Sequence, residues 1–92
     1  MIPLSVPFLK GKELDYVSEC IETEWISSSG AYVNRFEREI GRYLGTPFAV
    51  ACINGTSALH ISLILSGISQ EEEVIVPTLT FIAPINAVRY VG

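Results

Sequence analysis

The residues best suited to bind a ligand lie in one short turn, Gly55-Thr56-Ser57, which follows an apolar run at 48–53. If that run is a strand and a helix begins at the turn, the first amides of the helix have no partners inside it. Together with the positive end of the helix dipole, these amides could hold an anion such as a phosphate. Thr56 and Ser57 would add hydroxyl donors. The same residues would also serve as a simple helix N-cap, so the spacing leaves both interpretations open.

A second candidate, Phe81, follows another apolar run at 73–77. In an open α/β sheet, ligands bind at the carboxyl ends of the strands. The turn and Phe81 are therefore expected to meet in one crevice, where a phenyl ring can stack on a flat ligand. A phenylalanine packed in the core is the alternative interpretation of this residue.

The third candidate is the loop between two expected helices, Trp25-Ile26-Ser27-Ser28-Ser29-Gly30. Serine and glycine favour irregular backbone, because serine hydroxyls compete for local hydrogen bonds. Trp25, with Ser27 and Ser29, could line a sugar site. Trp25 could equally pack the first helix onto a neighbouring element.

The elements that must position these residues follow from hydrophobic spacing. Apolar stripes predict helices at about 12–23, 32–44 and 80–90, and Gly45 is well placed to end the second. The continuous runs at 48–53 and 73–77 are typical of strands buried on both faces. The segment 57–66 fits a β-hairpin and a helix equally well by its local pattern. Two parallel strands need a long crossover, normally a helix, and this favours the helix.

Composition narrows the class of protein. The 92 residues are 49% hydrophobic and 17% charged, which is apolar for one small domain and suggests part of something larger. The net charge of −4 is spread thinly without a basic stripe, so no nucleic-acid partner is expected. Cys20, Cys52 and His60 lack the spacing of a metal site. With no signal peptide and no apolar stretch long enough for a membrane, a cytoplasmic location is expected.

Taken together, the motifs resemble the opening of the DegT/StrS sugar aminotransferases. These are pyridoxal-phosphate (PLP) enzymes that place an amino group on a nucleotide-linked keto-sugar. Within the family, the pattern is most similar to enzymes acting on UDP-linked 4-keto-6-deoxy sugars of the legionaminic acid type. The matching motifs follow one another in the expected order: Ile2-Pro3-Leu4-Ser5-Val6-Pro7, Gly11-Lys12-Glu13, Trp25-Ile26-Ser27-Ser28-Ser29-Gly30, Phe36-Glu37, Asn54-Gly55-Thr56-Ser57-Ala58-Leu59-His60, Val74-Ile75-Val76-Pro77-Thr78-Leu79-Thr80-Phe81 and Asn86-Ala87.

The resemblance implies an α/β fold, the N-terminal part of the large domain of the aspartate-aminotransferase fold (PLP fold type I), with a mostly parallel sheet. Residues 1–92 would be a single partial domain, with N-terminal helices over about 12–44 and the βαβ-type start of the PLP-binding part over about 48–92. The resemblance also implies that Gly55, Thr56 and Ser57 bind the PLP phosphate and that Phe81 stacks on the pyridine ring. The partners would be a nucleotide-linked keto-sugar, an amino donor such as glutamate, and a second copy of the chain in a homodimer.

The resemblance covers only the opening part of the family's length, so an N-terminal fragment is expected. The Schiff-base lysine of the family has no counterpart here, because Lys10 and Lys12 are the only lysines. No catalytic residue is therefore assigned, and the 92 residues alone are expected to be inactive. Glu24 stands where the family usually has glycine. Two alternatives remain: a PLP-dependent sugar dehydratase of the same family, and a non-catalytic module that binds a phosphate or nucleotide through the same turn.

Overall fold

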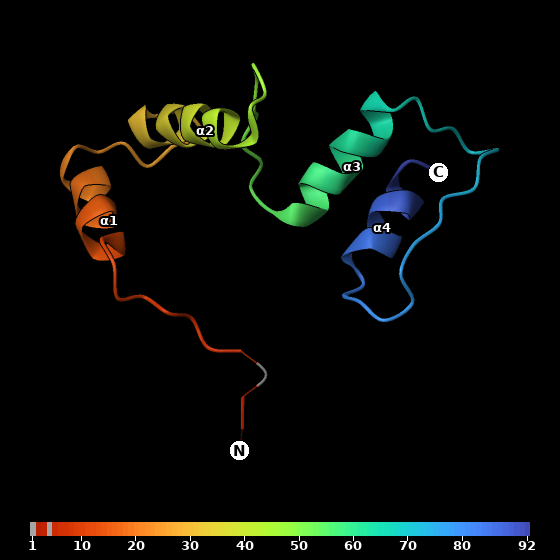
Figure 1. Ribbon diagram of the computed structural model, residues 1–92, viewed down its shortest axis with the longest axis horizontal. Coiled ribbons are helices and arrows are strands. Elements are labelled where there is room, and N and C mark those ends of the chain that lie inside the picture. The colour runs from red at the N-terminus through yellow and green to blue at the C-terminus, as the bar shows by residue number, and fades with distance from the viewer. Residues whose placement is uncertain (1, 4) are drawn as a thin grey trace. The chain divides into compact units, whose positions relative to one another are not determined.

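The computed structural model describes residues 2–3 and 5–92, which form two compact units, Met1–Ala49 and Val50–Gly92. The first unit contains helices α1 (Glu13–Glu22) and α2 (Ala31–Leu44). The second contains α3 (Gly55–Leu65) and α4 (Ala83–Tyr90) (Figure 1). None of these helices combines the length and the hydrophobicity that crossing a membrane requires, within the residues described.

All four helices predicted from the sequence are confirmed, including the ambiguous segment at 57–66, which forms α3. The largest shift is at α4, which begins at Ala83 and carries Pro84 in its first turn, where the missing N–H costs least. The predicted stop at Gly45 is also confirmed. Its φ of 66° lies in the left-handed region that glycine adopts without strain.

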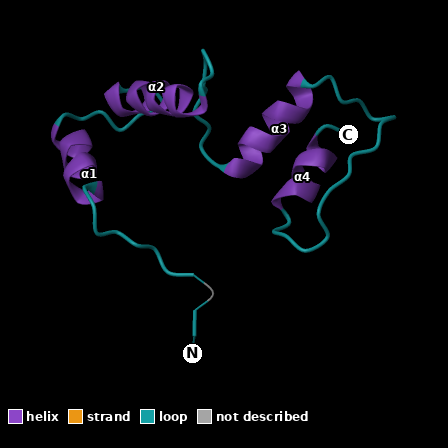
Figure 2. Cartoon of the chain, in the orientation of Figure 1, coloured by secondary structure: helices purple, strands orange, loops and turns teal. Residues whose placement is uncertain are grey.

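The two predicted strands are not formed. Residues 48–53 and 73–77 are loop, and no strand occurs among the described residues (Figure 2). A strand satisfies its backbone groups by pairing with neighbours, and one that is apolar on both sides also needs a covering layer on each face. Val50 and Ile75 are 82% and 101% exposed, so neither run is covered in this way. The predicted parallel sheet is therefore not shown by the described residues of this structure.

In the first unit, α1 and α2 do not pack backbone against backbone. Long side chains bridge the two helices instead, and the Tyr16 and Tyr32 rings lie with their centroids 5.1 Å apart. The chain leaves α1 through Glu24, which has a φ of 57° although it is not glycine. The amide of Trp25 then donates to the carbonyl of Cys20 at 3.0 Å and closes the end of the helix.

In the second unit, α3 and α4 lie side by side (Figure 1). Ala87 of α4 is 1% exposed, and it is the one hydrophobic residue that is buried among the residues the structure describes. His60 meets the edge of Tyr90 with ring centroids 5.6 Å apart. The Gln70 side chain, just beyond α3, lies against Gly92, just beyond α4. The two helices run in the same direction, so both N-terminal ends lie at one end of the unit (Figure 1).

Candidate functional site

The turn Gly55-Thr56-Ser57 forms the first three residues of α3. Asn54 precedes it in an extended conformation and acts as the N-cap, because its side-chain Oδ1 accepts a hydrogen bond from the Ser57 amide at 2.9 Å. The first bond along the helix runs from the Ala58 amide to the Asn54 carbonyl at 3.1 Å. The amides of Gly55 and Thr56 precede that bond and point out of the end of the helix.

The approach to this turn is open. A Cβ atom built on Gly55 would meet no other atom within 4 Å, and Gly55 itself is exposed. Two outward amides, two nearby hydroxyls and the positive end of the helix dipole suit an anion of the size of a phosphate. The role of these three residues in binding the phosphate of PLP stays a prediction, and the donors of the turn are compatible with it.

Sequence reasoning missed Asn54 as the cap of α3. The available signal was an asparagine directly before the helix. Its side-chain oxygen accepts a hydrogen bond from the amide three residues further along the chain. That signal was obscured because Asn-Gly is also the typical pair of a tight hairpin turn.

Phe81 lies two residues before α4 begins, and its side chain is 82% exposed. It is therefore not part of a packed core in this structure. Since the N-terminal ends of α3 and α4 lie at the same end of the second unit, Phe81 and the Gly55-Thr56-Ser57 turn belong to that same end.

The loop between α1 and α2 encloses a small hollow of about 150 Å³. Trp25 and Ser27 of the predicted sugar site both line it, whereas Ser29 does not. Ser29 instead donates its amide to the Ser27 hydroxyl oxygen at 3.3 Å, which is a bond that shapes the loop. The hollow is lined by Glu19, Cys20, Thr23, Trp25, Ser27, Gly30, Ala31, Tyr32 and Val33.

One hydrogen bond spans the two ends of this loop. The Tyr32 hydroxyl in α2 donates to Glu19 Oε2 in α1 at 2.5 Å. This bond to the carboxylate, with partial desolvation and the negative charge of Glu19, raises the pKa of Tyr32 from 10.0 to about 12. Because that pKa is raised, the bond is intact below pH 10 and is lost as the pH rises toward 12. Sequence reasoning missed this pair, since no local pattern links residues 13 positions apart.

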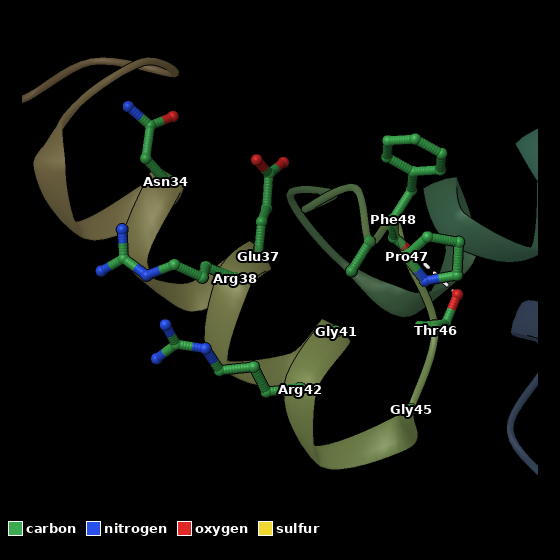
Figure 3. Close-up of a pocket in the computed structure, with 10 residues that line it drawn as sticks. Asn34, Glu37, Arg38, Gly41, Arg42, Gly45, Thr46, Pro47 and Phe48 are labelled. Carbon is green, nitrogen blue, oxygen red and sulfur yellow. Dashed lines mark hydrogen bonds between the residues drawn. The ribbon is translucent and has the colours of Figure 1, made fainter.

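A larger hollow of about 540 Å³ lies beside α2, between that helix and residues 45–49 (Figure 3). Arg38 and Arg42 extend from α2 on the side away from Pro47 and Phe48 (Figure 3). Both arginines approach Glu39 Oε1, at 3.8 and 3.1 Å. Exposed ion pairs of this kind contribute little to stability. No residue of the predicted sites lines this hollow.

Comparison with known proteins identifies the class to which the chain belongs. Residues 7–92 match the DegT/DnrJ/EryC1/StrS aminotransferase family, and the chain is a member of that family. The resemblance that the sequence motifs suggested is therefore confirmed.

Among its relatives, the chain is 48% identical over 91 residues to the GDP-perosamine synthase of Escherichia coli O157:H7, covering 99% of this chain and 25% of that protein. It is 50% identical over 91 residues to the GDP-perosamine synthase of Caulobacter vibrioides, covering 99% and 24%. A relative from Bacillus subtilis named "Putative pyridoxal phosphate-dependent aminotransferase EpsN" is 35% identical over 89 residues, covering 97% and 23%. The chain thus spans about a quarter of the length of these relatives.

Proposed function

We propose that the full-length protein is a PLP-dependent aminotransferase that transfers an amino group from a donor such as glutamate to a nucleotide-linked keto-sugar, in amino-sugar biosynthesis. The observation that carries this proposal is membership of the aminotransferase family over residues 7–92, together with 48% and 50% identity to two GDP-perosamine synthases. The names of these relatives favour a GDP-linked sugar over a UDP-linked one.

In this proposal, the first turn of α3 holds the phosphate of the cofactor. The amides of Gly55 and Thr56 would donate to the phosphate oxygens, and the Thr56 and Ser57 hydroxyls would add two further donors. The Asn54 cap supports this role, because it fixes the direction of the first turn at its N-terminal end. Bound PLP supplies an electron sink for the carbon that carries the amino group.

Phe81 would lie against the flat face of the cofactor ring, and its exposed side chain at the same end of the unit is compatible with that role. Trp25 and Ser27, with Ser29 shaping their loop, would contact the sugar. The apolar runs at 48–53 and 73–77 would become strands of a parallel sheet once further strands cover them. The full-length enzyme would form a homodimer and act in the cytoplasm.

The phosphate contact is tested with the double variant Thr56→Ala/Ser57→Ala in the full-length enzyme. Each lost hydrogen bond to a charged group weakens binding by about 1.5–3 kcal/mol, and the backbone amides retain part of the affinity. Titration of the cofactor, followed by its absorbance, should show a clearly raised dissociation constant.

The matched control is Ser62→Ala/Ser66→Ala, which removes one hydroxyl from the same helix and one from its C-cap residue. Those hydroxyls donate to the carbonyls of Ala58 and Ser62 at 2.8 Å, so the control should bind PLP as the parent does. Equal cofactor affinity in the parent and in the Thr56/Ser57 variant would rule out this phosphate site. A parent that forms no amino-sugar from glutamate and a GDP-linked keto-sugar would contradict the proposed activity itself.

A further inference from the structure

The side chains that bridge α1 and α2 are not used by the proposed cofactor site, yet they surround the loop that joins these helices. We propose that Glu19 and Tyr32 form a positioning pair that holds the loop Trp25–Gly30 in the shape that receives the nucleotide-linked sugar. The sugar part of this inference rests on the proposed function, whereas the holding of the loop rests on the geometry alone.

The first support is where the bond lies. Glu19 is in the last turns of α1 and Tyr32 is the second residue of α2, so their 2.5 Å hydrogen bond closes the loop near both of its ends. The backbones of the two helices do not pack together within the described residues. Interactions between side chains must therefore keep the ends of the loop at a fixed separation.

The second support is that the phenol ring of Tyr32 is itself held in place. The Tyr16 ring of α1 lies against it at 5.1 Å between centroids, with the planes tilted by 47°. The Arg35 guanidinium lies over the other aromatic ring, 5.7 Å from the Tyr16 centroid. These contacts restrict the Tyr32 ring, so that its hydroxyl is aimed at one carboxylate rather than free to rotate.

The third support is the hollow of about 150 Å³, which Glu19 and Tyr32 line together with Trp25, Ser27 and Gly30. Its volume corresponds to about five water molecules at their share of liquid volume, or to one small polar group. The Ser27 hydroxyl and the Glu19 carboxylate offer hydrogen bonds to such a group, and Trp25 offers an apolar surface. If the pair separated, the hollow would lose one of its walls.

The test compares three variants of the full-length enzyme. Tyr32→Phe removes the donor and keeps the ring, and Glu19→Gln keeps an acceptor oxygen without the charge. Tyr43→Phe removes the same hydroxyl from an 87% exposed tyrosine near the other end of α2 and serves as the control. Hydrogen exchange of the peptide covering 24–31 reports on the loop, and steady-state kinetics give KM and kcat for the nucleotide sugar.

We expect Tyr32→Phe to speed exchange of the loop amides by roughly threefold or more, the scale set by one modest hydrogen bond. KM for the nucleotide sugar should rise by a similar factor, while kcat and cofactor occupancy stay near their parent values. The exchange rate of the loop amides and the KM of Glu19→Gln should lie between those of Tyr32→Phe and the parent. Both quantities in Tyr43→Phe should match the parent. If Tyr32→Phe fails to fold, Glu19→Ala removes the bond from the other helix and replaces it in the comparison.

The outcomes separate the two proposals. Unchanged exchange at 24–31 in Tyr32→Phe overturns the positioning pair. Faster exchange with an unchanged KM overturns its role in receiving the sugar. A parent enzyme that turns over no nucleotide sugar refutes the proposed function and the sugar part with it, and the exchange data then decide on their own whether the pair holds the loop.

Discussion

The two units bring their helices together in different ways. In the second unit, α3 and α4 lie directly side by side, and the small side chain of Ala87 in α4 is buried. In the first unit, the ends of Tyr16, Tyr32 and Glu19 span the space between α1 and α2. A small residue allows two helices to approach closely. Long side chains keep α1 and α2 apart, and the hollow of about 150 Å³ lies beside the loop that joins these two bridged helices.

The largest effect is expected when the 92 residues are produced alone, because neither unit should then be stably packed. Both units leave large apolar side chains exposed, and a groove of about 730 Å³ with a mostly apolar lining lies between α1 and α2. The 92-residue polypeptide produced on its own is therefore expected to associate or to remain loosely packed. It should show no cooperative unfolding transition by circular dichroism. Having only Lys10 and Lys12, it should also form no productive imine with PLP.

Sedimentation of the polypeptide tests whether it associates. A single monomeric species that unfolds cooperatively would show that the two units are stable by themselves. Turnover of an amino donor and a GDP-linked keto-sugar, with an adduct that borohydride reduces, would show that one of the two lysines is catalytic.

A smaller effect is expected from the direct packing in the second unit. Ala87→Leu forces extra carbons into a buried position on α4, which packs beside α3, and overpacking of this kind costs about 1–3 kcal/mol. Denaturant unfolding of the full-length protein should show the loss. The control, Ala31→Leu, makes the same change at an exposed position of α2 and should alter stability far less. Equal losses in both variants would mean that Ala87 is not a packing contact.

The smallest effect concerns the strained end of α1. Glu24 has a φ of 57°, which lies in the left-handed region that glycine adopts without strain. Glu24→Gly should stabilise the full-length protein by about 0.5–1 kcal/mol, because the relief of strain exceeds the added flexibility of the unfolded chain. Glu22→Gly, within α1, should instead destabilise by about 1 kcal/mol. If both variants lowered the free energy of unfolding, the left-handed conformation of Glu24 would carry no strain.

The helices were predictable because their signals are local. Apolar spacing located α1, α2 and α4, and Gly45 marked the end of α2. The identification of α3 is instructive, since it depended on two parallel strands that this structure does not form. The helix was right because its own residues support it, with Asn54 capping its start. The strands failed because strand formation depends on partners that a run of apolar residues does not itself contain.

The candidate site likewise contains one feature that the local sequence predicts and one that it does not. The position of Gly55-Thr56-Ser57 at a helix start follows from the local sequence, and the structure has it there. The bond between Glu19 and Tyr32 joins two helices across a loop, and each residue alone resembles an ordinary helix residue. A contact of that kind depends on how the loop turns, which the spacing of apolar residues does not encode.

The Asn54 cap has a further consequence for the chemical ageing of this protein. An asparagine followed by glycine is prone to lose ammonia, because the unbranched glycine leaves its backbone nitrogen free to attack the side-chain carbon. Conversion to aspartate would keep the hydrogen bond from the Ser57 amide, and the new charge would even favour the start of the helix. The same charge would repel a phosphate at the turn. Loss of ammonia leaves a cyclic imide that water opens to aspartate or to isoaspartate. The aspartate product would preserve the start of α3 and lower its affinity for an anion, whereas isoaspartate adds a methylene to the main chain and would also break the cap.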